Sequence, residues 1–413
     1  MTAVKMFDGA DRRAIDRLVA RPLSGEASMS DRVGRIVADV RRRGDRAVKA
    51  YARQLDGMTG SLEIGREEIA AGAHATPAPV RRALREAGAH IRKVARAQLP
   101  RSWSTQVAPG VVVEQRVTPL DRVGCYVPGG RFPLPSSLLM TAVPARIAGV
   151  REVIACCPKP APVVLAAAAE AGIDRLFRVG GAHAIAALAY GTATIPQVDK
   201  IVGPGSRYVA EAKALVVRDC AIDFYAGPSE IVIVSSAAPA TWIAADMLAQ
   251  AEHDPDARAV FITTRPTLAR AVLNAIEQRM PATGPARASL ATRGAIIVVK
   301  TRDEAIALAD RFVPEHLVCD DDEVASRVRA GTVFVGPWSA QAAGDYGTGS
   351  NHVLPTSGAA RFRGGLSAAD FVRVSSVQRL TRTGLKRIGQ TIITLAEAEG
   401  LTAHAESIRE RLR

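Results

Sequence analysis

A chain of 413 residues is too long for one small hydrophobic core, and at about 150 residues per domain it predicts two or three domains. Hydrophobic residues make up 48% and charged residues 23%, as in a soluble globular protein. No apolar run is long enough to cross a bilayer. Acidic residues near the N-terminus argue against a secretory signal. The net charge of +13 comes mostly from arginines scattered through helical segments without the basic–aromatic alternation that stacks bases, so we expect neither a nucleic-acid nor a membrane partner.

The predicted elements begin with helices. A helical arm is expected over residues 1–24, followed by an amphipathic segment over 29–57 and another helix over 77–97. The strands "EVIACCP", "RLFRVGG" and "DKIVGPG" then each precede a helix, and the strands from "IVIVSS" to "TVFVGP" also alternate with helices. This alternation predicts parallel sheets covered on both faces, in two blocks that meet near "IDFYAGPSE". A Gly/Ser/Arg-rich stretch after Pro355 leads into a helical tail over 381–413.

The cysteines indicate the redox environment. They number five, an odd count, and are Cys125, Cys156, Cys157, Cys220 and Cys319. Their irregular spacing argues against a disulfide framework and against a zinc motif, so we expect reduced, buried thiols in a cytoplasmic protein.

The stretch "VPEHLVC" places the two commonest proton-transfer side chains, Glu315 and His316, next to each other. Neighbouring side chains of a regular strand point to opposite faces. Either one of the two lies in solvent, or the backbone is irregular and both reach one site. Pro314 precedes the pair and biases the backbone around it, so we predict that it marks such an irregularity.

Two motifs late in the chain combine histidine with oxygen donors. In "LAQAEHD", Gln250 and His253 are three residues apart on a predicted helix, so one metal ion could touch both, although a polar helix end in water gives the same pattern. The Gly-rich "AAGDYGTGSNHVLP" contains Asp345 and His352, and such a loop is either a flexible turn or backbone placed close to a ligand.

A third motif of this kind lies in the tail. "EAEGLTAHAES" contains Glu399 and His404, for which a solvated helix surface is the alternative interpretation. Taken with the two earlier motifs, the imidazole and oxygen donors suit zinc, while other first-row metals remain open. Their shared late position suggests a single site.

Three glycine motifs, "GCYVPGG", "VGGAHAIAALAYGT" and "IVGPGSRY", each follow a predicted strand. The second and third also open a helix, where free N–H groups favour anions. None is the dinucleotide fingerprint GxGxxG. By themselves these motifs indicate tight turns, with a phosphate or dinucleotide site as the second interpretation.

The order of these motifs resembles the histidinol dehydrogenase family. The resemblance runs from about residue 30 to the C-terminus through eight collinear stretches, which also include "RVGCYVPGGRFPLPSSLLMTAVPARIAGV" and "GDYGTGSNHVLPTSG". It implies a zinc-dependent enzyme of the last steps of histidine biosynthesis. L-histidinol would be oxidised through the aldehyde to L-histidine with two NAD⁺ and one zinc ion per subunit.

Position by position, the resemblance implies roles for individual residues. The zinc ligands would be Gln250, His253, Asp345 and His404. The catalytic pair would be Glu315 and His316. The substrate would be held by Ser229, His352 and Glu399, together with His316 and the four zinc ligands. The nicotinamide cofactor would contact Tyr126, His183 and Ser206.

These assignments agree with the chemistry of the side chains. Removal of an alcohol proton needs a base of near-neutral pKa, which suits His316. The second oxidation needs water added to an aldehyde, and Glu315 is the candidate to activate that water. Zinc would mainly hold the substrate through its nitrogen atoms.

The resemblance also implies a fold and an assembly. Two incomplete Rossmann-like domains with parallel sheets are expected, one inserted in the other, with a small N-terminal arm and a C-terminal helical tail. The arm is residues 1–24, the first domain 25–122 and 236–360, the inserted cofactor-binding domain 123–235, and the tail 361–413. The family forms a homodimer in which the tail completes the partner's site, which would place Glu399 and His404 in trans.

The sequence departs from the family pattern at four positions. His183 stands where glutamine is usual and Ser206 where asparagine is usual, so both changes bear on the binding of NAD. Ala340 and Gln341 replace a usual Pro-Glu pair just before Asp345. Every predicted metal and catalytic position is intact.

Three alternatives remain behind this interpretation. A paralogue could oxidise a different small alcohol, as the altered cofactor positions suggest. A zinc hydrolase could use Glu315 to activate water, although the glycine-rich turns favour a dinucleotide enzyme. A basic nucleic-acid-binding protein without catalysis is the last, and salt-dependent DNA retention would test it.

Overall fold

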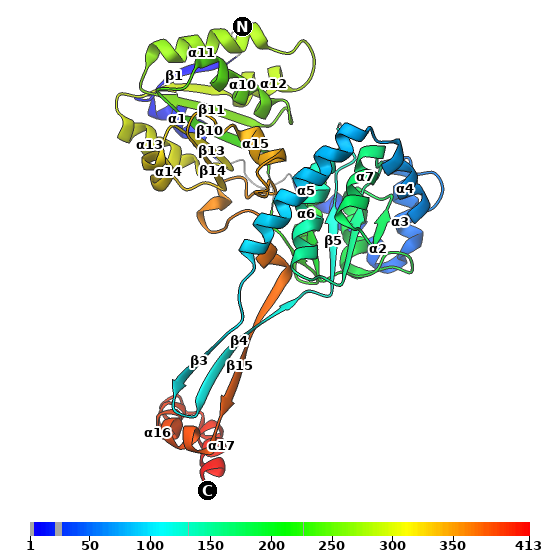
Figure 1. The fold of residues 1–413 in the computed structure, drawn as a ribbon, viewed down its shortest axis with the longest axis vertical. Coiled ribbons are helices and arrows are strands. Elements are labelled where there is room, and N and C mark those ends of the chain that lie inside the picture. The colour runs from blue at the N-terminus through cyan, green and yellow to red at the C-terminus, as the bar shows by residue number, and fades with distance from the viewer. Residues whose placement is uncertain (1–3, 21–26, 131, 226) are drawn as a thin grey trace.

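The chain forms two α/β lobes and a long arm in a computed structural model that describes residues 4–20, 27–130, 132–225 and 227–413 (Figure 1). Each lobe is built around one six-stranded sheet, and a three-stranded sheet runs along the arm. The predicted α/β class with parallel sheets and a C-terminal helical tail is confirmed. Within the described ranges, no helix combines the length and apolar character needed to cross a membrane.

The first lobe contains sheet A, whose strands all pair in parallel in the order β1-β12-β11-β10-β13-β14. The strands are β1 (Lys5–Asp8), β10 (Glu230–Val234), β11 (Arg258–Thr263), β12 (Ala295–Val298), β13 (His316–Cys319) and β14 (Thr332–Val335). The helices are α1 (Arg12–Val19), α10 (Ala240–Ala251), α11 (Pro266–Arg279), α12 (Ala286–Arg293), α13 (Arg302–Phe312) and α14 (Asp322–Arg327).

Strand β10 shows why helices cover both faces of sheet A. All five of its residues are buried, and its side chains alternate between two cores. Ile231 and Ile233 pack with α10, α11 and α12, whereas Val232 and Val234 pack with α1, α13 and α14. A strand that is apolar on both faces must be covered on both faces, which explains the continuous run "EIVIV".

The second lobe contains sheet B in the order β2-β7-β6-β5-β8-β9, parallel except for β2 against β7. The strands are β2 (Glu63–Ile64), β5 (Arg122–Tyr126), β6 (Glu152–Cys156), β7 (Arg175–Phe177), β8 (Lys200–Val202) and β9 (Ala221–Ile222). The helices are α2 (Ala27–Arg43), α3 (Asp45–Tyr51) with the π-helical η1 (Ala52–Asp56), α4 (Arg66–Ala75), α5 (Ala78–Gln98), α6 (Pro135–Ile147), α7 (Pro162–Ala171), α8 (Gly181–Tyr190) and α9 (Arg207–Val216).

The arm leaves the second lobe as an antiparallel sheet of β15, β4 and β3. Its strands are β3 (Trp103–Ala108), β4 (Val111–Pro119) and β15 (Val372–Leu380), and it ends in helices α16 (Arg382–Ala398) and α17 (Thr402–Leu412). The short elements α15 (Gln341–Tyr346), η2 (Ala359–Arg361) and η3 (Ala368–Phe371) connect β14 to the arm. Figure 1 shows α16 and α17 at the end of the molecule opposite to both lobes.

The predicted domain boundaries differ from this arrangement. The prediction groups residues 25–122 with 236–360, whereas α2 to α5 pack with the helices of sheet B. Strand β10 lies inside the predicted insert 123–235 but occupies the middle of sheet A.

The two terminal segments also differ from the prediction. The arm predicted as helical over 1–24 contains strand β1, and its residues 1–3 and 21–24 lie outside the described residues. The predicted tail 361–413 contains β15 as well as two helices. Hydrophobic periodicity identifies an element but not the sheet that it joins.

The connections of the two sheets determine where side chains can form a site. In sheet B the chain winds from β5 through β6 to β7 on one side and places β8 and β9 on the other, so the strand order reverses between β5 and β8. In sheet A the order reverses between β10 and β13. Ligands of open α/β sheets bind beyond the carboxyl ends of the strands at such a reversal.

Candidate functional site

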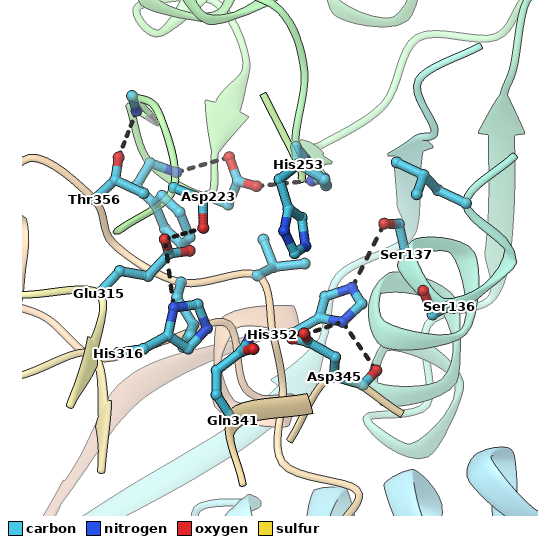
Figure 2. A pocket seen from close by; sticks show the side chains of 18 of the residues that line it. Ser136, Ser137, Asp223, His253, Glu315, His316, Gln341, Asp345, His352 and Thr356 are labelled. Carbon is cyan, nitrogen blue, oxygen red and sulfur yellow. Dashed lines mark hydrogen bonds and ion pairs between the residues drawn. The ribbon is translucent and has the colours of Figure 1, made fainter. Parts of the chain in front are cut away.

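A cavity of about 190 Å³ lies between the amino ends of sheet A strands and the carboxyl ends of sheet B strands. The sheet A lobe contributes Ser229 before β10, His253 after α10, and Glu315 and His316 at the start of β13. Sheet B contributes residues after β8 and β9, and further lining comes from the start of α6 and from the segment that follows β14. The polar side chains of the lining are Ser136, Ser137, Asp223, Ser229, His253, Glu315, His316, Gln341, Asp345, Tyr346, His352 and Thr356. Figure 2 shows the rings of His253, His316 and His352 around a shared space.

The backbone before β13 explains how two adjacent side chains enter one cavity. Helix α13 ends at Phe312, and the next residue, Val313, has a left-handed φ of 47°, an uncommon conformation for a β-branched residue. Strand β13 begins only at His316, so Glu315 precedes the regular alternation of the strand. Both side chains line the cavity. The irregularity predicted at Pro314 therefore lies one residue earlier, at the end of the helix.

Glu315 is held by two donors in a buried position. The Ser229 hydroxyl donates to Oε2 at 2.6 Å and the Glu230 backbone N–H donates to the same atom at 2.9 Å. Burial raises the pKa of Glu315 to about 8, and these two hydrogen bonds only partly oppose the effect. Because this value lies near neutrality, the carboxyl group can either hold or accept a proton under ordinary conditions.

His316 is fixed in one tautomer. Its Nδ1 lies 3.1 Å from the carbonyl oxygen of Glu230, and since a carbonyl only accepts, Nδ1 carries the proton. Burial lowers the pKa of the His316 imidazole, which favours the neutral ring. The other ring nitrogen, Nε2, is then an unprotonated acceptor, as a general base requires. The ring also stacks on Phe334, at 6.2 Å between centroids.

The end of α10 presents two potential metal ligands. His253 Nδ1 lies 3.0 Å from the Ala249 carbonyl oxygen, so Nε2 is left as the acceptor. The Gln250 side chain donates through Nε2 to Ser229 at 2.8 Å, while its Oε1 is buried without a hydrogen-bond partner among the described residues. A buried amide oxygen is costly to leave unpaired. The unpaired oxygen and the free imidazole nitrogen therefore fit a cation bound at this point.

Asp345 and His352 face the cavity from the segment after β14. Asp345 Oδ2 accepts from Gln341 Nε2 at 2.7 Å, and His352 Nδ1 donates to the Asp345 carbonyl at 3.1 Å. Burial lowers the pKa of His352. Gly349 in this loop has φ 80° and lies against the backbone of His90, where a Cβ would collide. This glycine allows the loop to pack closely on helix α5, which is neither the flexible turn nor the approach to a ligand that the sequence suggested.

The tail residues do not reach this cavity in their own chain. Glu399 follows α16 and His404 lies in the first turn of α17, and both side chains are exposed at the far end of the arm. In the part of the chain that the structure describes, no three His, Cys, Asp or Glu side chains gather as a metal site. Gln250, His253 and Asp345 thus form at most part of a ligand set within one chain.

The three predicted cofactor residues lie along the carboxyl edge of sheet B, around its strand-order reversal. Tyr126 ends β5 and accepts from the Gly181 N–H at 3.1 Å. His183 on α8 is only 1% exposed and its Nε2 lies 2.9 Å from Asp56 Oδ2, so its ring is enclosed by protein. Ser206 precedes α9 and is exposed. The cavity is lined instead by the nearby Gly203 and Pro204.

Comparison with known proteins identifies the family. The model of the family described as histidinol dehydrogenase matches residues 19–412. The histidinol dehydrogenase of Methanothermobacter thermautotrophicus is 45% identical over 98% of both chains, and that of Methylococcus capsulatus is 45% identical over 97% of this chain and 95% of its own. The crystal structure of histidinol dehydrogenase from Elizabethkingia anophelis matches with a TM-score of 0.94 at 30% identity, covering 100% of this chain and 98% of the other.

The chain belongs to the histidinol dehydrogenase family. It is therefore an oxidoreductase, and the resemblance drawn from its motifs is confirmed. The fold match also confirms the α/β architecture over nearly the whole chain. The motifs "FVPEHLVC" and "AQAEHD" both contribute residues to the cavity between the two sheets.

Sequence reasoning missed several residues that shape this histidinol dehydrogenase site. Lys213 and Asp223 form a buried ion pair at 2.7 Å, and both hold the backbone of Gly203, through its carbonyl oxygen and its N–H. Gly203 has φ 116°, and a Cβ there would collide with the carbonyl oxygen of Tyr126. A lysine and an aspartate ten residues apart give no pattern that distinguishes them from surface charges. Ser137 Oγ lies 3.5 Å from His352 Nε2. The sequence indicated only that Ser137 lies at the start of a helix, after Pro135.

Proposed function

We propose that this protein oxidises L-histidinol through the aldehyde to L-histidine, using two NAD⁺ and one zinc ion per subunit. The observation that carries the proposal is the pair Glu315 and His316, two buried groups that can exchange protons on one cavity. Two successive oxidations at one carbon need two proton-handling groups, whereas a single oxidation needs one. When bound, NAD⁺ accepts hydride from the substrate carbon, and zinc holds the substrate's amino and imidazole nitrogens.

His316 removes the alcohol proton in the first oxidation. Its Nδ1–H is directed to the Glu230 carbonyl, so Nε2 is the atom that accepts the proton. The substrate carbon can then release hydride as the carbonyl forms. The pKa of His316, lowered by burial, keeps the ring neutral before the reaction begins.

Glu315 acts in the second oxidation, when water adds to the aldehyde carbon. Its Oε2 is taken by Ser229 and Glu230, while Oε1 makes no hydrogen bond to the described residues and can accept one from water. His316, after releasing its first proton to solvent, takes the proton of the hydrated aldehyde as hydride passes to the second NAD⁺. One hydroxyl oxygen from water is retained in the product carboxylate.

The residues present fit a zinc ion. Gln250 supplies a buried oxygen without a partner among the described residues, His253 a free Nε2, and Asp345 the oxygen Oδ1 that Gln341 leaves available. A fourth ligand, His404, would come from the tail of a second subunit. Nitrogen and oxygen ligands of this kind are typical of zinc.

The arm supports a homodimer in which each tail completes the other subunit's site. Its terminal helices share only a small core of Ile393, Ala396 and Ala405, while Leu395 is 60% exposed. Such a small unit with exposed leucine gains stability by packing on another surface. A homodimer of this kind brings Glu399 and His404 to the partner's cavity. The nicotinamide cofactor is proposed to bind at the carboxyl edge of sheet B, where Tyr126, His183 and Ser206 lie; of these three residues Ser206 alone is exposed. A cytoplasmic location accords with five cysteines that are all free thiols.

The decisive experiment is the appearance of NADH from L-histidinol with purified protein, before and after removal of zinc by a chelator. We expect two NADH to form for each histidine. This activity should be lost when zinc is removed and restored when zinc is added back. Bound zinc without turnover of L-histidinol, with NAD⁺ or NADP⁺, would contradict the proposal and favour a paralogue acting on another small alcohol. The altered cofactor positions His183 and Ser206 are what make this second outcome worth testing.

A further inference from the structure

A second cavity, of about 290 Å³, lies at the opposite edge of sheet A from the catalytic candidates. Ser235 after β10, Asp320 after β13 and Gly336 after β14 line it, so it is at the carboxyl ends of these strands. It lies where the strand order of sheet A reverses, between β10 and β13. Open α/β sheets bind ligands at this place, but the function proposed above uses only the amino edge of sheet A.

Two tryptophans line this cavity together. Trp242 on α10 and Trp338 in the segment after β14 approach to 5.3 Å between ring centroids with a 48° tilt. Trp338 is 84% exposed and Trp242 40% exposed, so large aromatic surfaces face solvent. An aromatic face is negatively polarised and attracts a cation placed above it. The exposed faces of the two rings are therefore accessible to a bound cation.

The charged groups of this cavity are both acidic. Asp246 lies one turn after Trp242 on α10, on the same face of the helix, and it makes no hydrogen bond or ion pair to any residue that the structure describes. Asp320 accepts from the Ser235 hydroxyl at 2.6 Å and from the Ser236 N–H at 2.9 Å, so it is fixed in place. Burial raises the pKa of Asp246 to about 6, which a nearby cation would reverse.

We propose that this cavity binds a small organic ammonium cation, held between the tryptophan faces and the carboxylates of Asp246 and Asp320. The location alone would also suit a nucleotide. Two acidic side chains and no basic one in the lining argue against a phosphate group. Aromatic rings combined with an unpaired carboxylate are the features that recognise amines and quaternary ammonium groups.

Choline is the probe, and its neutral isostere 3,3-dimethylbutan-1-ol is the matched control. Binding is measured by tryptophan fluorescence and calorimetry in a Trp103→Phe background, since Trp103 on β3 of the arm is the only other tryptophan of the chain. We expect choline to bind and the alcohol to bind about tenfold more weakly or not at all. Equal affinity for the two compounds would overturn the proposal.

Three variants locate the binding. Asp246→Asn keeps the shape of the side chain, and Trp338→Ala removes a ring that is 84% exposed. Each should weaken choline binding by about tenfold. His316→Asn, at the other edge of the sheet, should leave choline binding unchanged. Loss of choline binding in His316→Asn, or unchanged binding in both Asp246→Asn and Trp338→Ala, would assign the cation elsewhere and refute this site. Saturable binding of AMP in place of choline would also refute it.

Discussion

At the scale of single residues, the site depends on hydrogen bonds that fix which atom of a side chain is available. His253, His316 and His352 all have Nδ1 beside a backbone carbonyl oxygen, at 3.0 to 3.1 Å. Each therefore has Nε2 as its acceptor atom, and the Nε2 of His352 lies 3.5 Å from the Ser137 hydroxyl. In the function proposed above, these nitrogen atoms have different partners: a metal ion for His253, the reacting alcohol for His316 and the rest of the substrate for His352.

His316→Asn should lower turnover of L-histidinol by about 10²- to 10⁴-fold, the usual contribution of a general base. The amide keeps a donor for the Glu230 carbonyl but cannot accept the alcohol proton. Single-turnover formation of NADH measures the effect, and elemental analysis of zinc is the control. Because His316 is not among the proposed ligands, zinc content should be unchanged. A rate near that of the wild type would remove His316 as the base.

Gln341→Ala should weaken zinc binding by about 10- to 100-fold, as is usual when the group that orients a metal ligand is removed. The Gln341 amide donates to Asp345 Oδ2 and leaves Oδ1 available for the metal. Competition with a chromophoric chelator measures the affinity. His253→Ala, which removes a proposed zinc ligand, is the reference for the loss of affinity when one ligand is missing. Unchanged affinity in Gln341→Ala would show that Asp345 is positioned without it.

Glu315→Gln should make zinc-free protein more stable at alkaline pH and leave its stability unchanged at acid pH. The folded-state pKa of about 8 lies above the ordinary value of 4.5, so the wild type loses stability as pH rises between these values. Glutamine has no such titration and still accepts from Ser229 through its carbonyl oxygen. Thermal unfolding at pH 5 and pH 9 tests this. An equal difference between variant and wild type at both pH values would contradict the raised pKa.

At the scale of elements, turns and helix ends bring the site residues together. The Gly203 turn between β8 and α9 lines the cavity, and its carbonyl and N–H groups are both held by the Lys213–Asp223 pair. Helix α10 starts at the carboxyl edge of sheet A and ends at the amino edge, where it presents Gln250 and His253. Helix α10 thus places Trp242 and Asp246 in the second cavity and, just beyond its end, His253 in the first.

Lys213→Met should destabilise the protein by about 3–5 kcal/mol, because it leaves the buried Asp223 carboxylate without its cation. Chemical denaturation followed by circular dichroism measures the loss. The double variant Lys213→Met, Asp223→Asn removes both charges and should recover part of the stability. If the double variant is as unstable as the sum of the single ones, the ion pair is not the reason for the loss.

At the scale of the whole molecule, the arm holds Glu399 and His404 away from their own chain's cavity (Figure 1). The proposed site is then made of the lobes of one subunit and the tail of another. A symmetric dimer contains two such sites, each with the same composition.

Mixed dimers of His404→Ala and His316→Asn subunits should regain activity that neither variant has alone. One of the two sites in each mixed dimer combines intact lobes with an intact tail, and the other carries both substitutions. Subunits are mixed after reversible dissociation and the mixed dimer is isolated by two affinity tags. An inactive mixed dimer that binds zinc normally would place His404 outside the partner's site.

The fold class, the family and most of the candidate side chains could be predicted from the amino-acid sequence. Strand and helix periods are local properties, and motifs such as "VPEHLVC" keep their order along the chain, so both can be identified without tertiary contacts. The backbone irregularity before β13 was also predictable in kind, although it lies at Val313 and not at Pro314.

Which elements share a sheet, and which atoms face the cavity, became known from the three-dimensional contacts. Helices α2 to α5 join sheet B and β1 joins sheet A, because long-range pairing and burial, not local propensity, select the partner. The Lys213–Asp223 ion pair is buried, and burial makes an unpaired charge costly, so each side chain requires the other. Gln250 Oε1 is also buried, but it has no hydrogen-bond partner among the described residues. The cavity of Trp242 and Trp338 likewise exists only where two distant segments meet.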